Sequence, residues 1–429
     1  MGAEREPLAV IGVGYVGLVT AAGFAELGRD VWCVDIDAAR IERLRAGEVP
    51  IHEPGLGEVL AAQRERLHFT TDLAEALQHA RLLFVAVGTP PTYSGDADLS
   101  AVHAVVDALP ADGRHALVMK STVPSGTGAA VKRTLAARGG PDFPYVSCPE
   151  FLREGSALAD FRHPDRVVIG DDGGEAGDAV AALYEPLGAP LVRTDVTSAE
   201  MIKLASNAFL ATKISFINEI ANVCEETGAD VNEVARGMGL DPRVGASFLQ
   251  AGVGFGGSCF PKDVNALKQL AGNSGYHFQL LGAVIEVNEL QKRRVVGKLQ
   301  KHLGSLAGKT VTLLGLAFKP DTDDMREASS LVLAARLQAE GAYVRAYDPV
   351  AEAGAAELMA GVELAPGPLE AVAGADAVVL VTEWDEFVEL DWGAVAQGMN
   401  GRLLIDGRNA LDPETVRAAG LDYEGIGRQ

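Results

Sequence analysis

Short apolar runs alternate with helical patterns through the first part of the chain. Residues 8–12 predict a buried strand, 17–27 a helix that ends at Gly28, and 30–34 a second strand. Three more apolar runs predict further strands, with helical patterns between them: 82–87, 116–119 and 167–169. Strands that alternate with helices indicate a parallel sheet that is covered on both faces.

The pattern changes near Thr197. Residues 198–227 contain neither Gly nor Pro, and their apolar side chains recur at helical spacing. This predicts one helix of about 30 residues, about 45 Å long at 1.5 Å per residue. Such a helix exceeds the needs of one domain, so we expect it to link domains and to offer a dimer surface.

After about Gly304 the first pattern returns. The predicted elements are a strand and turn at 309–315, a helix at 329–340 and strands at 343–348, 377–381 and 403–405. We expect a loop at 361–367 and frayed residues at the very end. The predicted fold is α/β, with two Rossmann-like doubly wound domains joined by a long central helix and a helical middle domain. The expected domains are 1–196, 197–303 and 304–429.

Composition narrows the class of protein. Of 429 residues, 48% are apolar, enough for large cores, and 37 basic against 59 acidic residues give a net charge of −22. This acidity argues against nucleic-acid and membrane partners. The four cysteines and eight histidines form no disulfide or zinc pattern, so we expect no metal site and a cytoplasmic location. The apolar run 8–22 resembles a signal peptide, but Glu4, Glu6 and three glycines oppose this.

The first motif with chemistry is G-x-G-x-x-G at residues 12–17, between a predicted strand and a predicted helix. Its glycines permit a tight turn, close approach of a pyrophosphate and close helix packing, and the helix start supplies N–H groups. Asp35, 18 residues after Gly17, would accept hydrogen bonds from an adenosine ribose, which favours NAD over NADP. The alternative is a glycine turn in a domain that has lost its cofactor.

A second glycine-rich loop spans 252–258 and leads into Cys259, Pro261 and Lys262. Pro261 is suited to starting a helix, expected to reach about Leu270, so Cys259 would lie just before the helix start. A helix start and a nearby lysine both lower the pKa of a thiol and favour the nucleophilic thiolate. A buried structural cysteine is the alternative; it fits Cys33 and Cys224 well and Cys259 poorly.

Other polar groups are more ambiguous. Lys203 and Asn207 lie four residues apart among apolar neighbours, which fits either a solvated helix face or a lined cleft. The segment 149–155 holds two carboxylates and one arginine, and the segment 121–124 resembles a strand-end turn; either fits an ordinary surface. The basic residues at predicted strand ends of the last domain could hold a pyrophosphate or form salt bridges: Lys319, Arg326 and Arg408.

Together these segments resemble the UDP-glucose/GDP-mannose dehydrogenase family of nucleotide-sugar 6-dehydrogenases, and its UDP-glucose branch most closely. The motifs that carry the resemblance span nearly the whole chain: GVGYVGL at 12–18, GTP at 88–90, STVPSGT at 121–127, PEFLREGSA at 149–157, HPDRVVIG at 163–170, EMIKLASNAFLATKISFINEIA at 200–221, GFGGSCFPKD at 254–263, FKPDTDDMREAS at 318–329 and DGRN at 406–409.

The resemblance implies a catalytic set. Cys259 resembles the catalytic thiol, and Glu150 the base of the final hydrolysis. Thr122 resembles the threonine that places the water and the nicotinamide. The polar set around the reacting carbon and its water corresponds to Lys203, Asn207 and Asp263.

It also implies two binding sets. The residues that correspond to the NAD site are Gly12, Val13, Gly14, Tyr15, Val16, Gly17, Asp35, Arg40, Thr89, Thr122, Glu154, Lys262 and Arg326. Those that correspond to the UDP-sugar site are Glu150, Phe151, Leu152, Arg153, Lys203, Asn207, Arg243, Phe248, Gly256, Phe318, Lys319 and Arg408. Arg243 resembles an arginine that reaches the sugar from a neighbouring subunit, which implies at least a homodimer.

Two positions depart from the family pattern. Cys148 stands where the family usually has Asn, and the loss of the amide's hydrogen bonds puts the local loop geometry in question. Arg40 stands where a lysine is common beside the ribose, and we expect little change because both are basic.

The implied activity is the four-electron oxidation of UDP-glucose at C6 to UDP-glucuronate, with two NAD per sugar and a thiohemiacetal and thioester at Cys259. Three alternatives stay open at this stage. They are the same chemistry on GDP-mannose or an N-acetylated UDP-hexosamine, a two-electron dehydrogenase of the β-hydroxyacid type, and an NAD-sensing protein without turnover. The β-hydroxyacid type needs neither the thiol nor the second α/β domain.

Overall fold

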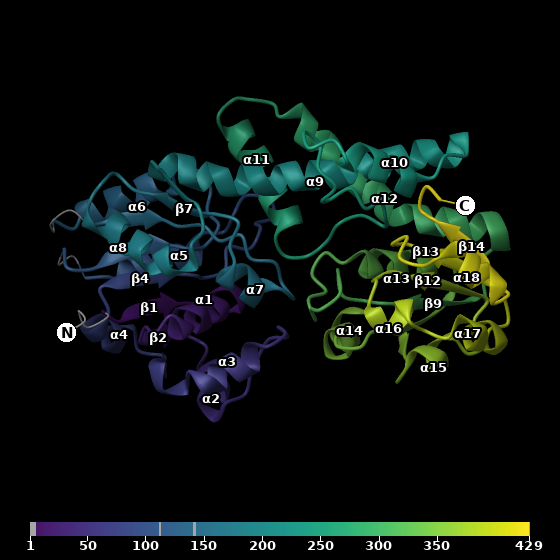
Figure 1. The fold of residues 1–429 in the computed structure, drawn as a ribbon, viewed down its shortest axis with the longest axis horizontal. Helices are drawn as coiled ribbons and strands as arrows, with labels where there is room; N and C mark the ends of the chain where they lie inside the picture. The colour runs from purple at the N-terminus through teal and green to yellow at the C-terminus, as the bar shows by residue number, and fades with distance from the viewer. Residues whose placement is uncertain (1–5, 111–112, 140–142, 429) are drawn as a thin grey trace. The chain divides into compact units, whose positions relative to one another are not determined.

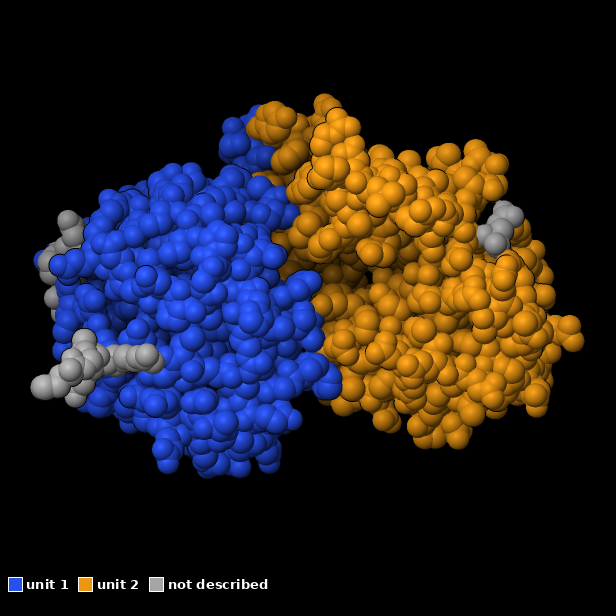
Figure 2. All heavy atoms as spheres, in the orientation of Figure 1, with its two compact units in different colours: residues 1–206, 269–275 blue, residues 207–268, 276–429 orange. Residues whose placement is uncertain are grey.

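A computed structural model describes residues 6–110, 113–139 and 143–428. The chain forms two compact units, the first made of Met1–Ser206 with Gln269–Gly275 and the second of Asn207–Lys268 with Tyr276–Gln429 (Figure 2). Glu4, which entered the argument against a signal peptide, lies outside the described residues. The division into three domains at 196 and 303 stays a prediction.

The first unit is built on an eight-stranded sheet of order β3-β2-β1-β4-β5-β6-β7-β8. Its strands are β1 (Leu8–Ile11), β2 (Val31–Val34), β3 (Leu67–Thr70), β4 (Leu82–Val85), β5 (Ala116–Met119), β6 (Tyr145–Ser147), β7 (Val167–Gly170) and β8 (Leu191–Thr194). Its helices are α1 (Tyr15–Glu26), α2 (Ala38–Ala46), α3 (Leu56–Ala62), η1 (Arg64–Arg66), α4 (Leu73–His79), α5 (Ser100–Ala108), α6 (Thr127–Ala136), α7 (Ala157–Arg162), α8 (Glu175–Tyr184) and η2 (Glu185–Leu187). The order reverses between β1 and β4, which confirms the predicted doubly wound architecture.

The expectation of a wholly parallel sheet is wrong at one junction. Strand β7 pairs antiparallel with β6, through Ser147 and Gly170, while β8 is parallel to β7. The reason is the 148–166 connection, which leaves the carboxyl edge of β6 and re-enters the sheet at that same edge. The segment that carries Glu150 is therefore kept at the edge of the sheet where ligands of such folds bind.

An aromatic cluster fixes α1 against the sheet in the first unit. The ring of Phe24 is fully buried. Its centre lies 5.0 Å from the ring centre of Phe84 and 5.3 Å from the ring centres of Phe161 and Tyr184. Close approach is possible because Gly23 has no side chain; a Cβ there would lie 2.2 Å from the Phe161 ring. This packing sets the position of α1, whose first turn follows the glycine motif.

The predicted long helix is confirmed as α9 (Val196–Thr227), which has 32 residues (Figure 1). Its first turns belong to the first unit and the rest to the second. In the first unit, the buried Glu200 carboxylate accepts hydrogen bonds of 2.7 Å from the backbone N–H groups of Gly126 and Gly128, at the start of α6. This contact fixes the rotation of α9 three residues before Lys203.

The second unit contains a six-stranded, fully parallel sheet of order β11-β10-β9-β12-β13-β14. Its strands are β9 (Thr310–Leu314), β10 (Tyr343–Tyr347), β11 (Glu363–Leu364), β12 (Ala377–Leu380), β13 (Leu403–Asp406) and β14 (Asp422–Gly425). Its helices, besides the rest of α9, are α10 (Val231–Gly239), α11 (Phe260–Asn273, whose last residues belong to the first unit), α12 (Gln279–Leu303), α13 (Ser329–Ala339), α14 (Glu352–Leu358), α15 (Pro368–Val372), α16 (Asp385–Val388), α17 (Trp392–Gly398) and α18 (Pro413–Ala418).

Two expectations about this unit are wrong. The segment 361–367 is not only a loop, because β11 pairs with β10 there. The end of the chain is ordered through Arg428: Ile426 donates its N–H to Asn409 at 2.9 Å, and Gly427 donates its own to Glu225 at 2.9 Å. Asn409 and Glu225 are distant in sequence from the backbone groups that they bind, so local sequence patterns could not reveal these contacts.

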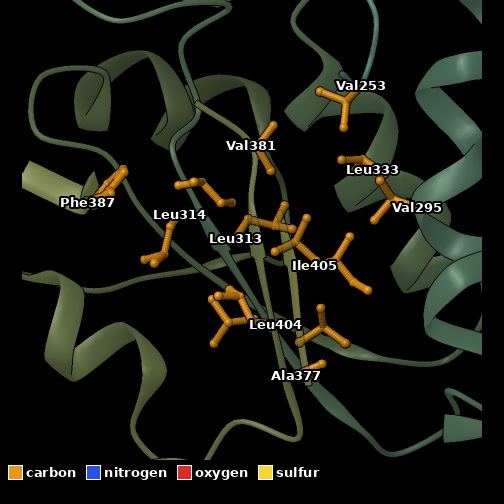
Figure 3. Close-up of a cluster of buried hydrophobic side chains, with 14 of the residues drawn as sticks. Val253, Val295, Leu313, Leu314, Leu333, Ala377, Val381, Phe387, Leu404 and Ile405 are labelled. Carbon is orange, nitrogen blue, oxygen red and sulfur yellow. The ribbon is translucent and has the colours of Figure 1, made fainter. Parts of the chain in front are cut away.

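The core of the second unit lies between the sheet and the helices that cover it. In Figure 3, Leu313 of β9 and Ile405 of β13 lie on one face of the sheet and Leu404 on the other, and Val295 of α12 lies beside Leu333 of α13. All five side chains are fully buried. Within the described residues, no helix combines the length and apolar character needed to cross a membrane.

We expect Phe24→Ala to destabilise the first unit by about 3–5 kcal/mol, because it removes a ring at the centre of the aromatic cluster. Thermal unfolding followed by circular dichroism measures the change. Tyr93→Ala, at a fully exposed tyrosine of the same unit, is the matched control and should change stability by less than about 0.5 kcal/mol. Equal unfolding temperatures for the two variants would contradict the assignment of Phe24 to the core.

Candidate active site

The glycine turn of the first unit has the conformation that its sequence predicts. Gly12 has φ +91°, and a Cβ there would lie 2.7 Å from the carbonyl oxygen of Ala86. A Cβ on Gly17 would lie 1.8 Å from the carbonyl oxygen of Gly12, so the turn and α1 require both glycines. Gly14, directly before α1, faces open space instead. Gly14 is therefore the place where a pyrophosphate can approach the helix N–H groups.

Asp35 follows β2 and is almost fully buried. Its carboxylate accepts the N–H of Val13 at 2.9 Å and that of Asp37 at 3.0 Å, and it pairs with the Arg40 guanidinium at 3.1 Å. Arg40 thus lies directly beside this carboxylate. The side chain of Ile36 next to it is 97% exposed, which leaves an apolar surface for an adenine ring.

A buried carboxylate that the sequence analysis missed links the glycine turn to the 149–156 segment. Glu53 accepts a hydrogen bond from the Tyr15 hydroxyl and accepts the backbone N–H groups of Gly155 at 2.8 Å and Leu158 at 3.1 Å. Burial, followed by the hydrogen bond to Glu53, raises the pKa of Tyr15, which stays a neutral donor. No local pattern marks Glu53, because its three partners are 38 to 105 residues away.

Glu150 and Lys203 form a buried ion pair in the first unit, with 2.9 Å between Oε1 and Nζ. The second oxygen of Glu150 accepts the N–H of Leu152 at 2.6 Å. Burial by itself raises the pKa of Glu150, but Lys203, the Leu152 N–H and Lys120 outweigh it and the net pKa is lowered. Lys203 is therefore not on a solvated face, and Glu150 is ionised.

Other predicted residues of the first unit lie on the loops after the central strands. The Thr89 hydroxyl donates to the Thr122 carbonyl at 2.9 Å, which brings these two predicted NAD contacts together. Cys148 is buried, and its N–H continues the sheet by donating to Met119 at 2.9 Å, so the replacement of the usual Asn leaves the strand end intact. Arg153 is an exception, since it is exposed and pairs with Asp160.

In the second unit, three amide side chains hold the glycine loop that precedes Cys259. Asn218 of α9 accepts the Gly252 N–H at 2.9 Å, and Gln291 of α12 donates to the Gly252 carbonyl at 2.9 Å. Asn288 of α12 accepts the Phe255 N–H at 2.8 Å and donates to its carbonyl at 3.0 Å. The sequence analysis missed these amides, which replace water at the loop's backbone and fix its path.

Cys259 comes directly before α11, which begins at Phe260 and runs past the expected end near Leu270. The cysteine is partly exposed, and its Sγ lies 3.6 Å from the Ser258 hydroxyl; the other three cysteines are buried. One turn into α11, the buried Asp263 carboxylate accepts Asn207 at 2.6 Å and Lys262 at 2.5 Å. A partly exposed thiol at a helix start suits nucleophilic attack on a carbonyl carbon.

The basic side chains of the second sheet are held at its strand ends. Arg408 donates to the carbonyl groups of Val381 at 2.6 Å and Phe318 at 2.8 Å and pairs with Glu383 at 3.2 Å. Arg326 pairs with Asp324 at 2.8 Å, and the Lys319 ammonium lies 5.7 Å from the Phe318 ring. The loop of Arg408 depends on Asp406, which accepts the N–H groups of Arg408 and Leu411.

This second sheet does not repeat the dinucleotide site of the first. Asp348 occupies the end of β10, as Asp35 occupies the end of β2, but it accepts the N–H groups of Leu316 at 2.7 Å and Ala317 at 3.0 Å. The Trp384 indole also donates to it at 3.2 Å. Its carboxylate is thus committed to the protein.

The predicted residues divide between the units. The first unit holds Gly12 to Gly17, Asp35, Arg40, Thr89, Thr122, Glu150, Phe151, Leu152, Arg153, Glu154 and Lys203. The second holds Asn207, Arg243, Phe248, Gly256, Cys259, Lys262, Asp263, Phe318, Lys319, Arg326 and Arg408. Within the ranges that the structure covers, no three His, Cys, Asp or Glu side chains are grouped as a metal site.

We expect Gly14→Ala to weaken NAD binding about tenfold or more, because the new methyl would occupy the space of the pyrophosphate. Its unfolding temperature should match the wild type, since no protein atom lies within 4 Å of that Cβ. Gly17→Ala is the matched control and should lose stability, because its Cβ overlaps the Gly12 carbonyl. Calorimetric titration with NAD and thermal unfolding distinguish the two; wild-type affinity in Gly14→Ala would refute this placement.

Comparisons with known proteins agree with this geometry. Three family descriptions of the UDP-glucose/GDP-mannose dehydrogenase family match the chain: the NAD-binding domain at 6–188, the central domain at 197–290 and the UDP-binding domain at 312–413. The UDP-glucose 6-dehydrogenase TuaD of Bacillus subtilis is 46% identical over 98% of this chain and 93% of its own. The UDP-glucose 6-dehydrogenase of Pseudomonas aeruginosa is 49% identical, over 98% of this chain and 97% of its own.

A solved UDP-glucose dehydrogenase from the archaeon Pyrobaculum islandicum is 40% identical, with a TM-score of 0.92, and the match covers 100% of this chain and 99% of that one. The identity over nearly the full length, the three matching domains and the fold all point the same way. The chain therefore belongs to the UDP-glucose/GDP-mannose dehydrogenase family and is an NAD-dependent dehydrogenase.

Proposed function

We propose that this enzyme oxidises UDP-glucose at C6 to UDP-glucuronate, a four-electron oxidation, through a covalent adduct at Cys259. The observation that carries the proposal is the partly exposed thiol directly before α11, on a loop fixed by Asn218, Asn288 and Gln291. A two-electron alcohol dehydrogenase has no need of a nucleophile. The relatives at 46% and 49% identity, which are named UDP-glucose 6-dehydrogenases, support this substrate.

The first oxidation needs hydrogen-bond donors for the C6 oxygen and an acceptor for its proton. Bound NAD supplies the hydride acceptor for each of the two oxidations. The Lys203 ammonium and the Asn207 amide are the donors, and a water held by Asp263 takes the proton. Each hydrogen-bond donor that is fixed before the reaction stabilises a developing oxyanion by a few kcal/mol. This corresponds to a rate increase of about 10²–10³ per donor.

The second oxidation depends on Cys259. Its thiolate forms a C–S bond with the aldehyde carbon, and the carbonyl oxygen takes a proton to give a thiohemiacetal. Loss of a hydride from that carbon and of the hydroxyl proton leaves a thioester. The covalent bond holds the reactive aldehyde while the cofactor is exchanged.

Hydrolysis releases the product. A water attacks the thioester carbon, the C–S bond breaks, and the electron pair returns to Cys259 as thiolate. Glu150 is ionised and can accept a proton from this water, which Thr122 positions. Lys203, its partner in the ion pair, stabilises the negative charge on the carbonyl oxygen.

The remaining residues of the sequence prediction are assigned to binding. We assign NAD to the glycine turn with Asp35, Arg40, Thr89, Thr122, Glu154, Lys262 and Arg326. We assign the UDP-sugar to Phe151, Leu152, Arg153, Phe248, Gly256, Phe318, Lys319 and Arg408. Arg408 and Lys319 suit this because they are cations at the strand ends of this sheet, where the aspartate after β10, Asp348, is engaged by backbone N–H groups.

We also propose a homodimer formed through α9. Phe209, Phe216 and Val223 recur every seven residues and are 66%, 48% and 57% exposed, so they form one apolar stripe along the second-unit part of this helix. Leu240 and Val244 add exposed apolar surface in the following segment. The exposed Arg243 beside them pairs only with its neighbour Asp241 among the described contacts, and it is suited to reach a second subunit.

We expect two NADH per UDP-glucose when a limiting, known amount of sugar is consumed with excess NAD and read at 340 nm. Cys259→Ser should fail to complete the reaction, because an alkoxide is a poorer nucleophile and leaving group than a thiolate; it should stall after the first oxidation or at a trapped adduct, visible by mass spectrometry. Cys224→Ser, at a buried cysteine, is the control and should keep two NADH per sugar.

One NADH per sugar in the wild type, or steady uronate production by Cys259→Ser, would overturn the thiol mechanism. If UDP-glucose gives no NADH, GDP-mannose and UDP-N-acetylhexosamines are the next substrates, and turnover of one of these would replace the substrate but keep the chemistry.

For the dimer, we expect Phe216→Asp to shift the full-length protein toward a monomer, because it places a charge in the centre of the apolar stripe. Sedimentation velocity measures the shift. Leu358→Asp, at another exposed leucine, is the control and should leave the mass unchanged. A wild-type protein that sediments as a monomer at micromolar concentration would contradict the proposed interface.

A further inference from the structure

Glu150 is surrounded by more positive charge than its ion pair requires. Lys203 binds it directly, and two further cations of the first unit contact its neighbours in the chain. The Lys120 ammonium lies 3.9 Å from the Cys148 sulfur, and the Arg166 guanidinium lies on the Phe151 ring. They come from different elements: Lys120 follows β5, Arg166 precedes β7 and Lys203 belongs to α9. Neither Lys120 nor Arg166 was assigned a role in the sequence prediction or in the mechanism above.

Lys120 is a buried ammonium with weakly polar neighbours. Its Nζ donates to the Tyr184 hydroxyl at 3.0 Å, lies 5.2 Å from the centre of that ring and is 3.9 Å from the Cys148 sulfur. Only 5% of the residue is exposed. A buried charge is costly unless another charge compensates it, and Glu150 is the carboxylate on which it acts.

Arg166 is held by stacking. Its guanidinium carbon lies 3.6 Å from the centre of the Phe151 ring, which belongs to the residue after Glu150. Burial lowers the pKa of Arg166, while Asp165 and Glu150 oppose this, and the side chain remains a cation. A planar guanidinium on an aromatic face is fixed in orientation without needing a carboxylate partner of its own.

These arrangements have a consequence for the reaction. In the proposed function Lys203 donates to the C6 oxygen, so its attraction to Glu150 weakens when substrate is present. A buried carboxylate with too little compensating positive charge takes up a proton and can no longer act as a base. Cations fixed elsewhere would prevent this.

We propose that Lys120 and Arg166 are positioning residues that keep Glu150 ionised and in place while Lys203 is engaged with the substrate. The proposal rests on the role of Glu150 as a base in the proposed function. It assigns a role to Lys120 and Arg166 that needs no contact with the substrate.

The charged and polar groups around Glu150 determine in which direction the removal of a cation shifts its pKa. Lys203, Lys120 and the Leu152 N–H lower the pKa of Glu150, and Arg166 adds a further attraction. Burial raises it. Removal of one cation should therefore raise the pKa of Glu150, and activity should be lost at a higher pH on the acid side.

The test is the pH dependence of kcat at saturating UDP-glucose and NAD, for the full-length enzyme. Lys120→Met and Arg166→Met should each move the acid limb upward by about half a pH unit or more, and kcat should fall more than KM changes. Lys120→Arg and Arg166→Lys keep the charge and should restore the wild-type limb. The controls are Lys132→Met and Arg162→Met, which remove a partly exposed and an exposed basic residue of the same unit that pair with Asp172 and Glu26.

A second measurement does not depend on turnover. The ¹³C resonance of the Glu150 carboxyl, identified by its absence in Glu150→Gln, reports the pKa of this group directly. Its titration should move upward in Lys120→Met and Arg166→Met. If the wild type shows no turnover, the proposed function fails, but this titration still tests the charge arrangement.

An unchanged acid limb together with an unchanged carboxyl titration in both methionine variants would overturn the proposal. Loss of activity without a shift would likewise overturn it and leave these residues a merely structural role. If Lys120→Met does not fold, Arg166→Met and the charge-preserving pair carry the same comparison.

Discussion

The candidate site of the first unit is held in place by one buried ion pair, Glu150 with Lys203. Two charges inside a protein are stable only when each compensates the other, and removal of one partner typically costs about 3–5 kcal/mol. The pair therefore fixes the loop after β6 to the first part of α9. Glu200 fixes the same part of α9, because its carboxylate binds the N–H groups at the start of α6. Lys203 is therefore held by its own ion pair and by the anchoring of the helical turn that precedes it.

The two sheets show how one topology serves two ligands. Each has an aspartate at the end of its second strand, Asp35 and Asp348. Asp35 lies beside a glycine turn whose Gly14 faces open space, whereas Asp348 closes its own turn through Leu316 and Ala317. Both strand-end carboxylates accept N–H groups of the turn after the first strand, Asp35 from Val13 and Asp348 from Leu316 and Ala317, so the two turns differ in their open space and in the basic residues nearby.

How much of the structure could be predicted depends on how far apart in the sequence the interacting residues lie. The glycine turn and the long helix are coded by nearby residues, through backbone freedom at Gly12 and an unbroken apolar pattern over 198–227, and both were confirmed. The antiparallel entry of β7 and the pairing of β11 were not foreseen, because each depends on where the chain re-enters a sheet. Glu53, Asn218 and Asn288 were missed for the same reason: each binds backbone groups more than thirty residues away.

The sequence by itself determined the alternation of strands and helices, the dinucleotide turn, and the thiol ahead of a helix, since backbone freedom and periodicity are local properties. The resemblance to the family added the roles of the residues. Only the tertiary structure decided that Lys203 is a buried partner of Glu150, that Asp263 binds Asn207, and that Asp348 is closed to a ligand. These are matters of desolvation and pairing between distant segments, and a carboxylate's ionisation is set by the charges that folding brings to it.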